Sequence, residues 1–327
     1  PKNRMQKKMK HRITWLFGII IYLMIINAQT AIAPGVYGDD LRTIIVDEYK
    51  TNFTLGYTNA RDTMFAVIDN NDGVVMGIYT EYSVPLIPGS DPSTTMYNGG
   101  INTEHLWPQS MYTGSEPMKS DLHHLFPCKE NVNSSRGNNP FGENLDEETD
   151  NWYYLDENLT NIPNENIDEY SESYISGGDG EDRFEPREDR KGDAARAMFY
   201  FKTMYSSVVD ESFFEVQNNV LFDWHYDDPV DEREFSRTWN IAYYQDDLPN
   251  PFIIDPTLVW RAYFSDLYYP GDVNSDQSID VLDIVLITGK ILETTYFTEL
   301  QYQQGDLNTD FSLDVLDIVL LVSIILQ

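Results

Sequence analysis

The sequence predicts an α+β domain followed by a small all-α domain. Two short runs rich in β-branched and aromatic residues, 64–69 and 74–79, flank a turn sequence at 70–73 and predict a β-hairpin. Apolar residues from Ala194 to Val208 recur at helical spacing. Near the C-terminus the chain repeats itself at a fixed offset, and each copy continues into an apolar helix.

The N-terminal segment has the pattern of a secretory signal peptide. A basic stretch precedes an apolar run from Ile13 to Ile26, and Ala31 and Ala33 supply the small residues that a signal peptidase reads. The run is short for a membrane span, although the pattern also fits an uncleaved anchor. We therefore expect a signal peptide over 1–33, a secreted, extracellular protein, and no stable membrane association after cleavage.

The rest of the chain is very acidic. Residues 1–33 contain six Lys and Arg and no Asp or Glu, so the remainder carries 16 basic and 54 acidic side chains, a formal charge of −38. Nucleic-acid binders usually show the opposite balance. A metal ion and a few local Arg and Lys can still supply positive charge at one site. Cys128 is the only cysteine, so we expect no internal disulfide and a small buried apolar side chain.

The middle of the chain alternates between predicted loops and helices. The segment 81–100 is rich in Pro, Gly, Ser and Thr and predicts a loop, and the acidic, Asn-rich segment 143–190 predicts long surface loops. Asp193 can cap the helix that follows, whose Met and aromatic stripe we interpret as core packing. A second helix is predicted over 212–224.

The residues with the clearest chemistry lie between positions 102 and 142. Three of the five histidines fall in this window together with carboxylate, carboxamide and guanidinium groups, namely Glu104, His105, Asp121, His123, His124, Asn133 and Arg136. Such a set can bind a metal, activate water and hold a phosphate.

Spacing suggests how these groups share one site. Glu104 and His105 are adjacent, so both can serve one site only at a strand end or in a loop. Asn133 and Arg136 are three residues apart and share a face if they lie on a helix. A carboxylate and a carboxamide oxygen suit Mg²⁺, and an imidazole beside it can deprotonate an attacking water. We expect His105 to be catalytic and His123 and His124 to be structural.

Five stretches, 102–110, 118–142, 191–205, 224–245 and 250–256, resemble the bacterial endonuclease I family with its ββα-metal (His-Me finger) fold. The resemblance implies that His105 is the general base and that Glu104 and Asn133 are Mg²⁺ ligands. It also implies that Arg136 lies near the phosphate or supports the helix of Asn133. The residues in supporting positions would be Asp121, His123 and His124. Some members place a phosphate-contacting arginine between the two histidine motifs. Residues 111–117 contain none here, and only Lys119 follows.

The C-terminal repeat places oxygen ligands at the spacing of a calcium loop. Segment 271–292 matches 305–326 at a 34-residue offset. The predicted Ca²⁺ ligands are Asp272, Asn274, Asp276, the Ser278 carbonyl, Asp280 and Asp283 in the first loop, and Asp306, Asn308, Asp310, the Ser312 carbonyl, Asp314 and Asp317 in the second. The alternative is two acidic helix starts without metal.

This repeat resembles a type I dockerin, a module that binds two Ca²⁺ ions and docks onto a cohesin. Two departures stand out. Loop position 6, where a calcium loop prefers Gly, holds Gln277 and Phe311. Loop positions 10 and 11, where dockerins often carry Ser or Thr, are Val-Leu in both copies, which leaves open a different class of partner.

Together these observations predict a nuclease domain over 34–262, a linker over 263–270 and a dockerin-like domain over 271–327. The expected function is secreted, Mg²⁺-dependent hydrolysis of phosphodiester bonds in DNA, RNA or both, with attachment to a cohesin-type partner. The alternative is a non-catalytic, calcium-dependent scaffold or adhesion protein with a decayed nuclease domain.

Overall fold

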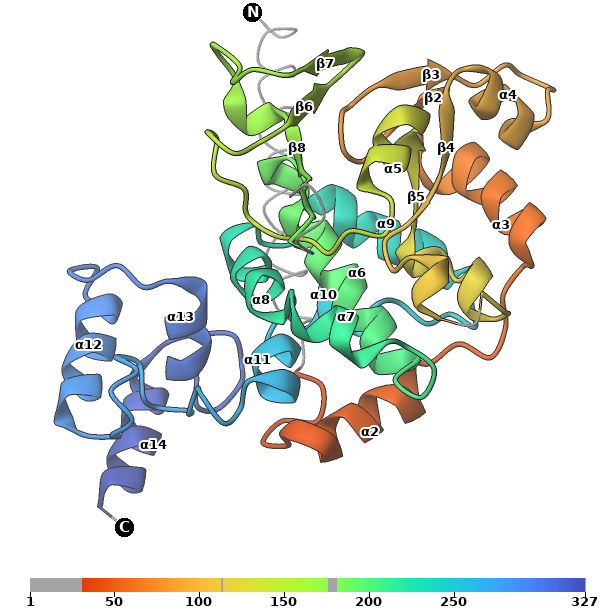
Figure 1. Cartoon of the computed structure of the whole chain (residues 1–327). Helices are drawn as coiled ribbons and strands as arrows, with labels where there is room; N and C mark the ends of the chain where they lie inside the picture. Colours follow the sequence, from red (N-terminus) through yellow and green to blue (C-terminus); the bar gives the residue numbers. More distant parts are fainter. Residues whose placement is uncertain (1–30, 113, 176–180, 327) are drawn as a thin grey trace, which may run out of the picture. The chain divides into compact units, whose positions relative to one another are not determined.

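The computed structural model describes residues 31–112, 114–175 and 181–326, so nearly all of the predicted signal peptide lies outside the described residues. The chain forms two compact units (Figure 1). We call Val36–Ser265 the larger unit. The second unit includes Asp266–Gln327, and we call this range the C-terminal unit. The predicted class, α+β followed by a small helical domain, is confirmed. Within the described ranges, no helix combines the length and apolar character that a bilayer crossing requires.

The larger unit mixes short strands with helices. Its α-helices are α2 (Gly38–Tyr49), α3 (Tyr57–Thr63), α4 (Pro92–Asn98), α5 (Glu130–Arg136), α6 (Lys191–Met204), α7 (Glu211–Glu215), α8 (Asn218–Asp227), α9 (Glu232–Ala242), α10 (Pro251–Ile254) and α11 (Leu258–Tyr263). Its strands are β1 (Asn70–Asn71), β2 (Val74–Met76), β3 (Ser83–Pro85), β4 (Ile101–His105), β5 (Leu125–Lys129), β6 (Asn151–Tyr154), β7 (Glu157–Leu159), β8 (Ser171–Tyr174) and β9 (Arg183–Glu185).

The first predicted strand is wrong. Met64–Ile68 continues α3 as a short π-helix, η1, and only the tight turn after it forms the expected hairpin, between β1 and β2. Met64, Phe65 and Ile68 are buried while Val67 is half exposed, which is a helical burial pattern rather than an alternating one. The predicted loop 81–100 also contains β3 and α4.

The strands β4 and β5 form the two-stranded antiparallel ladder that carries the site (Figure 1). Glu104 pairs with Phe126 and His105 with Leu125. The helix α5 begins directly after β5, and the backbone N–H of Glu130 donates to the carbonyl of Gly100 just before β4 (2.9 Å). This bond anchors the start of α5 beside β4. Apolar side chains from α3, η1, α4, β5 and α9 form the core around this ladder.

The loops predicted over 143–190 are also wrong in part, because this segment folds into a four-stranded sheet in the order β7-β6-β8-β9. Each strand has only three or four residues. Two of its buried side chains are acidic and have polar partners: Glu172 accepts a hydrogen bond from Thr149 (2.6 Å), and Glu185 pairs with Lys191 (2.7 Å). Buried carboxylates on such short strands hide the strand pattern in the sequence.

Helix α6 begins at Lys191, two residues before the predicted cap, and all of its residues are buried, which confirms the core interpretation of its apolar stripe. Asp193 forms an ion pair with Arg233 instead of capping the helix. Gly192 permits the close approach of α8, because a Cβ there would lie 2.0 Å from the carbonyl oxygen of Asp228. The predicted helix over 212–224 is two helices, α7 and α8.

The C-terminal unit contains three helices, α12 (Val281–Ile291), α13 (Glu299–Gly305) and α14 (Val315–Ile325). Helices α12 and α14 each begin with a capping box, formed by Asp280 with Asp283 and by Asp314 with Asp317. Val273, Ile287, Phe297 and Leu321 form a small core between the two repeats. The boundaries 34–262 and 271–327 and the linker 263–270 stay predictions.

Candidate active site

The end of β4 brings the Glu-His pair to one edge of the ladder. His105 is the last residue of the strand, as the adjacency of the two residues required. Asn133, on α5, donates through Nδ2 to Oδ1 of Asn102 (2.7 Å) and to the carbonyl oxygen of Thr103 (3.1 Å). These bonds attach the Asn133 side chain to the strand that carries Glu104 and His105.

The Glu104 carboxylate is buried, with 2% of the residue exposed. The Tyr79 hydroxyl donates to its Oε1 (2.9 Å), and Nη1 of Arg136 lies 3.6 Å from the same oxygen. Burial raises the pKa of Glu104, and the Arg136 guanidinium is the main effect that opposes this rise. The charge of Glu104 therefore depends on Arg136 and on any cation bound beside it.

His105 is held in one tautomer by a backbone carbonyl. Its Nε2 lies 3.1 Å from the carbonyl oxygen of Lys119, which can only accept, so Nε2 carries the proton and Nδ1 the lone pair. The amide nitrogen of Gln109 lies 3.2 Å from Nδ1. Burial, then the neighbouring His124, lowers the pKa of His105 to about 3. The imidazole is therefore neutral near pH 7, as a general base must be.

The side chains of Asp121, His123 and His124 are buried and form hydrogen bonds within the protein. The buried Asp121 carboxylate accepts hydrogen bonds from the hydroxyls of Tyr200 (2.9 Å) and Tyr205 (2.6 Å). His123 donates to the carbonyl of Leu248 (3.0 Å), and His124 lies 2.7 Å from that of Met118, with its ring edge-on to His105. These contacts fix the segment whose Lys119 carbonyl orients His105.

Three further side chains surround His105. The Tyr57 ring lies 5.6 Å from the imidazole, centroid to centroid. Nζ of Lys119 lies 4.7 Å and Cζ of Arg61 lies 5.4 Å from the centroid of the Tyr57 ring. Tyr57 and Arg61 come from α3, about forty residues before the Glu-His motif, so sequence spacing gave no signal for them.

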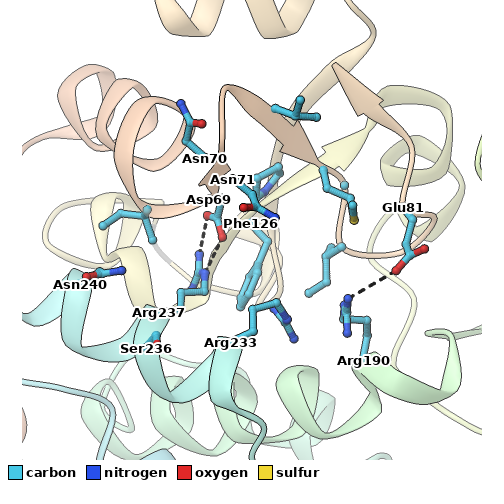
Figure 2. A pocket seen from close by; sticks show the side chains of 16 residues that line it. Asp69, Asn70, Asn71, Glu81, Phe126, Arg190, Arg233, Ser236, Arg237 and Asn240 are labelled. Carbon is cyan, nitrogen blue, oxygen red and sulfur yellow. Dashed lines mark hydrogen bonds and ion pairs between the residues drawn. The ribbon is translucent and has the colours of Figure 1, made fainter. Parts of the chain in front are cut away.

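A separate cleft of about 500 Å³ lies between the β1–β2 hairpin, β5 and α9, and three arginines line it (Figure 2). Arg237 pairs with Asp69 (2.7 Å) and Arg190 lies 3.8 Å from Glu81. Arg233 forms ion pairs with carboxylates next to the cleft. These guanidinium groups are therefore already neutralised by the protein.

The two C-terminal loops fold in the same way. Asp272 accepts from the backbone N–H of Gln277 (2.9 Å), and Asp306 accepts from that of Phe311 (2.7 Å). Gln277 and Phe311 have φ angles of 67° and 61°. Loop position 6 is therefore left-handed in both copies, and both copies carry a side chain where glycine is favoured.

A family model described as Endonuclease I matches residues 38–257, more than half of the chain. This chain belongs to the endonuclease I family. A second model, described as Dockerin type I domain, matches residues 270–326, so the C-terminal unit is a dockerin domain.

Two curated relatives of this endonuclease I member carry the same name. The "Extracellular ribonuclease" of Bacillus subtilis (strain 168) is 28% identical over 246 residues, which cover 68% of this chain and 74% of the relative. The "Extracellular ribonuclease" of Bacillus amyloliquefaciens is 31% identical over 179 residues, which cover 48% of this chain and 52% of the relative. The chain thus spans about half the length of the second relative.

The position of Arg136 bears on the two roles expected of it. Arg136 was expected either near the phosphate or in support of the Asn133 helix. It is fully buried, and its Nη2 donates to the carbonyl oxygen of Leu106 (2.7 Å). A guanidinium enclosed in this way cannot reach a substrate phosphate, so the geometry favours the supporting role.

The donors of the endonuclease I site fit a magnesium ion. Asn133 uses its amide nitrogen in both hydrogen bonds to β4, so its oxygen is the atom left for a cation. Glu104 adds a carboxylate. One or two protein oxygens with several waters are a common Mg²⁺ environment.

The dockerin loops offer only oxygen donors, as Ca²⁺ requires. Asp283 and Asp317 are fully buried, and burial raises the pKa of both. Burial also raises the pKa of Asp306 to about 6. Across the described residues, no group of three or more His, Cys, Asp or Glu side chains is placed to hold a metal ion. The chemistry of the donor atoms is therefore what supports a metal ion at Glu104 and Asn133 and in the dockerin loops.

Proposed function

We propose that the chain is a secreted, metal-dependent endonuclease whose dockerin domain attaches it to a cohesin-type partner. One observation carries the proposal: neutral His105 ends β4 directly after the buried carboxylate of Glu104, with Asn133 on the helix that follows the paired strand. Two antiparallel strands followed by a helix is the order expected of a ββα-metal (His-Me finger) site. Secretion is supported by the printed names of both relatives.

The chemistry of the base follows from the hydrogen bonds of His105. Its Nδ1 lone pair accepts the proton of an attacking water, and the Lys119 carbonyl keeps the ring oriented through Nε2. The bond to Lys119 survives protonation, because Nε2–H is a donor in both states of the ring. His105 thus keeps one orientation through the reaction.

Glu104 and Asn133 would hold Mg²⁺, which stabilises the charge that develops on the phosphate. Arg136 would keep the Glu104 carboxylate ionised before the metal arrives. In the dockerin domain, the twelve ligands from Asp272 to Asp283 and from Asp306 to Asp317 would hold two Ca²⁺ ions.

The substrate is DNA, RNA or both, and the printed names of the relatives favour RNA. The test is cleavage of a plasmid and of a structured RNA by the full chain, with added Mg²⁺ and with EDTA. Cleavage that EDTA abolishes and Mg²⁺ restores supports the proposal. Failure to cleave either polymer under any divalent ion would support the alternative, a non-catalytic scaffold protein with a decayed site.

The dockerin domain presents apolar side chains where a partner would bind. Val281, Leu282 and Val285 on α12 are exposed, as are their repeat equivalents Val315, Leu316 and Val319 on α14. Each set covers loop positions 10 and 11 and the first turn of the helix. We propose these two patches as the surface for a cohesin-type module with an apolar face.

A further inference from the structure

We infer that Arg61 and Lys119 bind the phosphate at the scissile bond, an inference that rests on the proposed nuclease function. The first observation concerns charge partners. The Arg and Lys side chains of the larger unit are held in ion pairs with carboxylates, with three exceptions among the described residues, Lys50, Arg61 and Lys119. In a chain with a formal charge of −32, an unpaired cation is unusual.

Two of these three cations converge on one aromatic ring beside the base. Nζ of Lys119 and Cζ of Arg61 lie 4.7 and 5.4 Å from the Tyr57 centroid, and this ring lies 5.6 Å from that of His105. Lys50 instead lies over the Tyr205 ring. The unpaired positive charge of the larger unit is thus concentrated where a nuclease must hold its phosphate.

Both residues form a hydrogen bond to a residue of β4. The Lys119 carbonyl accepts from His105, and Nε of Arg61 donates to Oγ1 of Thr103 (3.2 Å), the residue before Glu104. The first bond positions the backbone of Lys119, and the second positions the guanidinium of Arg61. Contact with the Tyr57 ring stabilises each cation, but it does not neutralise the positive charge of either one.

A bound anion would neutralise this charge. A phosphodiester fits best, because a guanidinium can pair with two phosphate oxygens while an ammonium acts as a point charge. The arginines of the cleft in Figure 2 do not compete for this role, since carboxylates already neutralise them. Among the described cations of the larger unit beside His105, Arg61 and Lys119 are therefore the two left to bind a phosphate.

The test measures binding separately from cleavage. Full-length His105→Ala protein, with and without Arg61→Ala or Lys119→Ala, is titrated with a fluorescent single-stranded RNA in Mg²⁺ at several salt concentrations. Each substitution should weaken binding about tenfold and make the plot of log affinity against log salt shallower by about 0.7 per lost contact. Lys290→Ala is the matched control, because Lys290 lies over the Tyr296 ring in the C-terminal unit.

The outcomes separate this inference from the proposed function. If wild type binds but does not cleave, and the two substitutions reduce the salt slope, the nuclease proposal fails and the phosphate site stands. If Arg61→Ala or Lys119→Ala has the same salt slope as Lys290→Ala, the substituted residue does not bind the phosphate. Arg61→Lys and Lys119→Gln, checked by thermal unfolding, repeat the measurement if an Ala variant loses its fold, and Arg61→Lys should keep the slope with reduced affinity.

Discussion

At the residue scale, the chemistry open to the candidate site depends on which atoms of its polar side chains already form hydrogen bonds within the protein. His105 uses Nε2 for the Lys119 carbonyl, and Asn133 uses Nδ2 for β4. Tyr79 and Arg136 both approach Oε1 of Glu104. Oδ1 of Asn133 is left for a cation, and the proposed chemistry uses the lone pair on Nδ1 of His105, which faces the amide nitrogen of Gln109 (3.2 Å).

His105→Ala should lower turnover by about two to four orders of magnitude, because a positioned general base contributes that much. The melting temperature and the Mg²⁺ midpoint of the residual activity should stay close to wild type. Single-turnover cleavage of RNA at saturating protein measures the effect. Turnover within threefold of wild type would show that another group accepts the proton.

Glu104→Ala and Asn133→Ala should each raise the Mg²⁺ concentration needed for half-maximal activity, because each removes one oxygen ligand. Asn131→Ala is the matched control, since Asn131 lies on the same helix and is exposed. Titration of initial rate against Mg²⁺ is the measurement. If the Mg²⁺ midpoint is unchanged in both variants, Glu104 and Asn133 are not the metal ligands.

The sequence motif predicted some of these residues and not others, for a physical reason. Glu104 and His105 are neighbours in the chain, and Asn133 and Arg136 share one helix, so short-range spacing relates them. Tyr57 and Arg61 reach the site only through the tertiary placement of α3, which brings them to His105 and Thr103. The burial of Arg136, which decides between its two expected roles, depends on side chains from several elements.

At the element scale, the structure departs from the sequence prediction where strands are short. Segment 143–190 forms four strands that bury Glu172 and Glu185, and no alternation of apolar residues marks them. The two loop-helix units of the C-terminal repeat were predictable, because the pattern of each loop lies within twelve residues and occurs twice. A local pattern that occurs twice was thus read correctly, while the single short run at 64–69 was misread as a strand and the pairings between short distant segments were missed.

Residues 271–327 expressed alone should be poorly ordered in EDTA and become helical with Ca²⁺. Burial raises the pKa of Asp283 and Asp317, so the ionised carboxylates of these loops are costly to pack without a cation that offsets their charge. Circular dichroism with and without Ca²⁺ tests this. Full helicity in EDTA, with no shift in melting temperature on adding Ca²⁺, would show that the repeat is not a calcium site.

Deleting residues 271–327 should leave Mg²⁺-dependent cleavage by the larger unit intact.

Helix α8 should make the larger unit sensitive to acid through His225. Its Nε2 lies 2.9 Å from the Pro256 carbonyl, and burial, then nearby Arg196, lowers its pKa to about 3. The unfolded chain takes up this proton near pH 6.5, so between pH 6.5 and 3 it binds more protons than the fold does. Stability therefore falls as pH falls through this window, by up to about 1.4 kcal/mol per pH unit.

His225→Gln keeps an N–H donor for Pro256 but cannot be protonated. Although the substitution should lower stability at pH 7, it should flatten the loss between pH 6.5 and 4.5. Urea unfolding of the larger unit at several pH values measures both effects. A pH slope equal to that of wild type would mean that other buried groups control acid stability.

At the scale of the whole molecule, the charge distribution sets how nucleic acid approaches. The chain has a formal charge of −32, while Arg61 and Lys119, which form no ion pair with any described carboxylate, lie close to the proposed base His105. Long-range forces should therefore oppose approach even though local contacts favour binding. Cleavage at fixed Mg²⁺ should fall less steeply with added NaCl than for a basic nuclease, and should stay level or rise at first. A steep fall from the lowest salt onward would point to a larger basic face.

Cys128 has a consequence for how the protein can be handled. It lies on β5, fully buried, and burial raises the pKa of its thiol well above the ordinary value. A protonated, enclosed thiol reacts slowly with oxidants and with maleimide reagents. Because it is the only cysteine in the chain, a single cysteine introduced at the surface would be the one thiol open to labelling in the native state. Spectroscopic probes can therefore be placed one at a time without first removing the native residue.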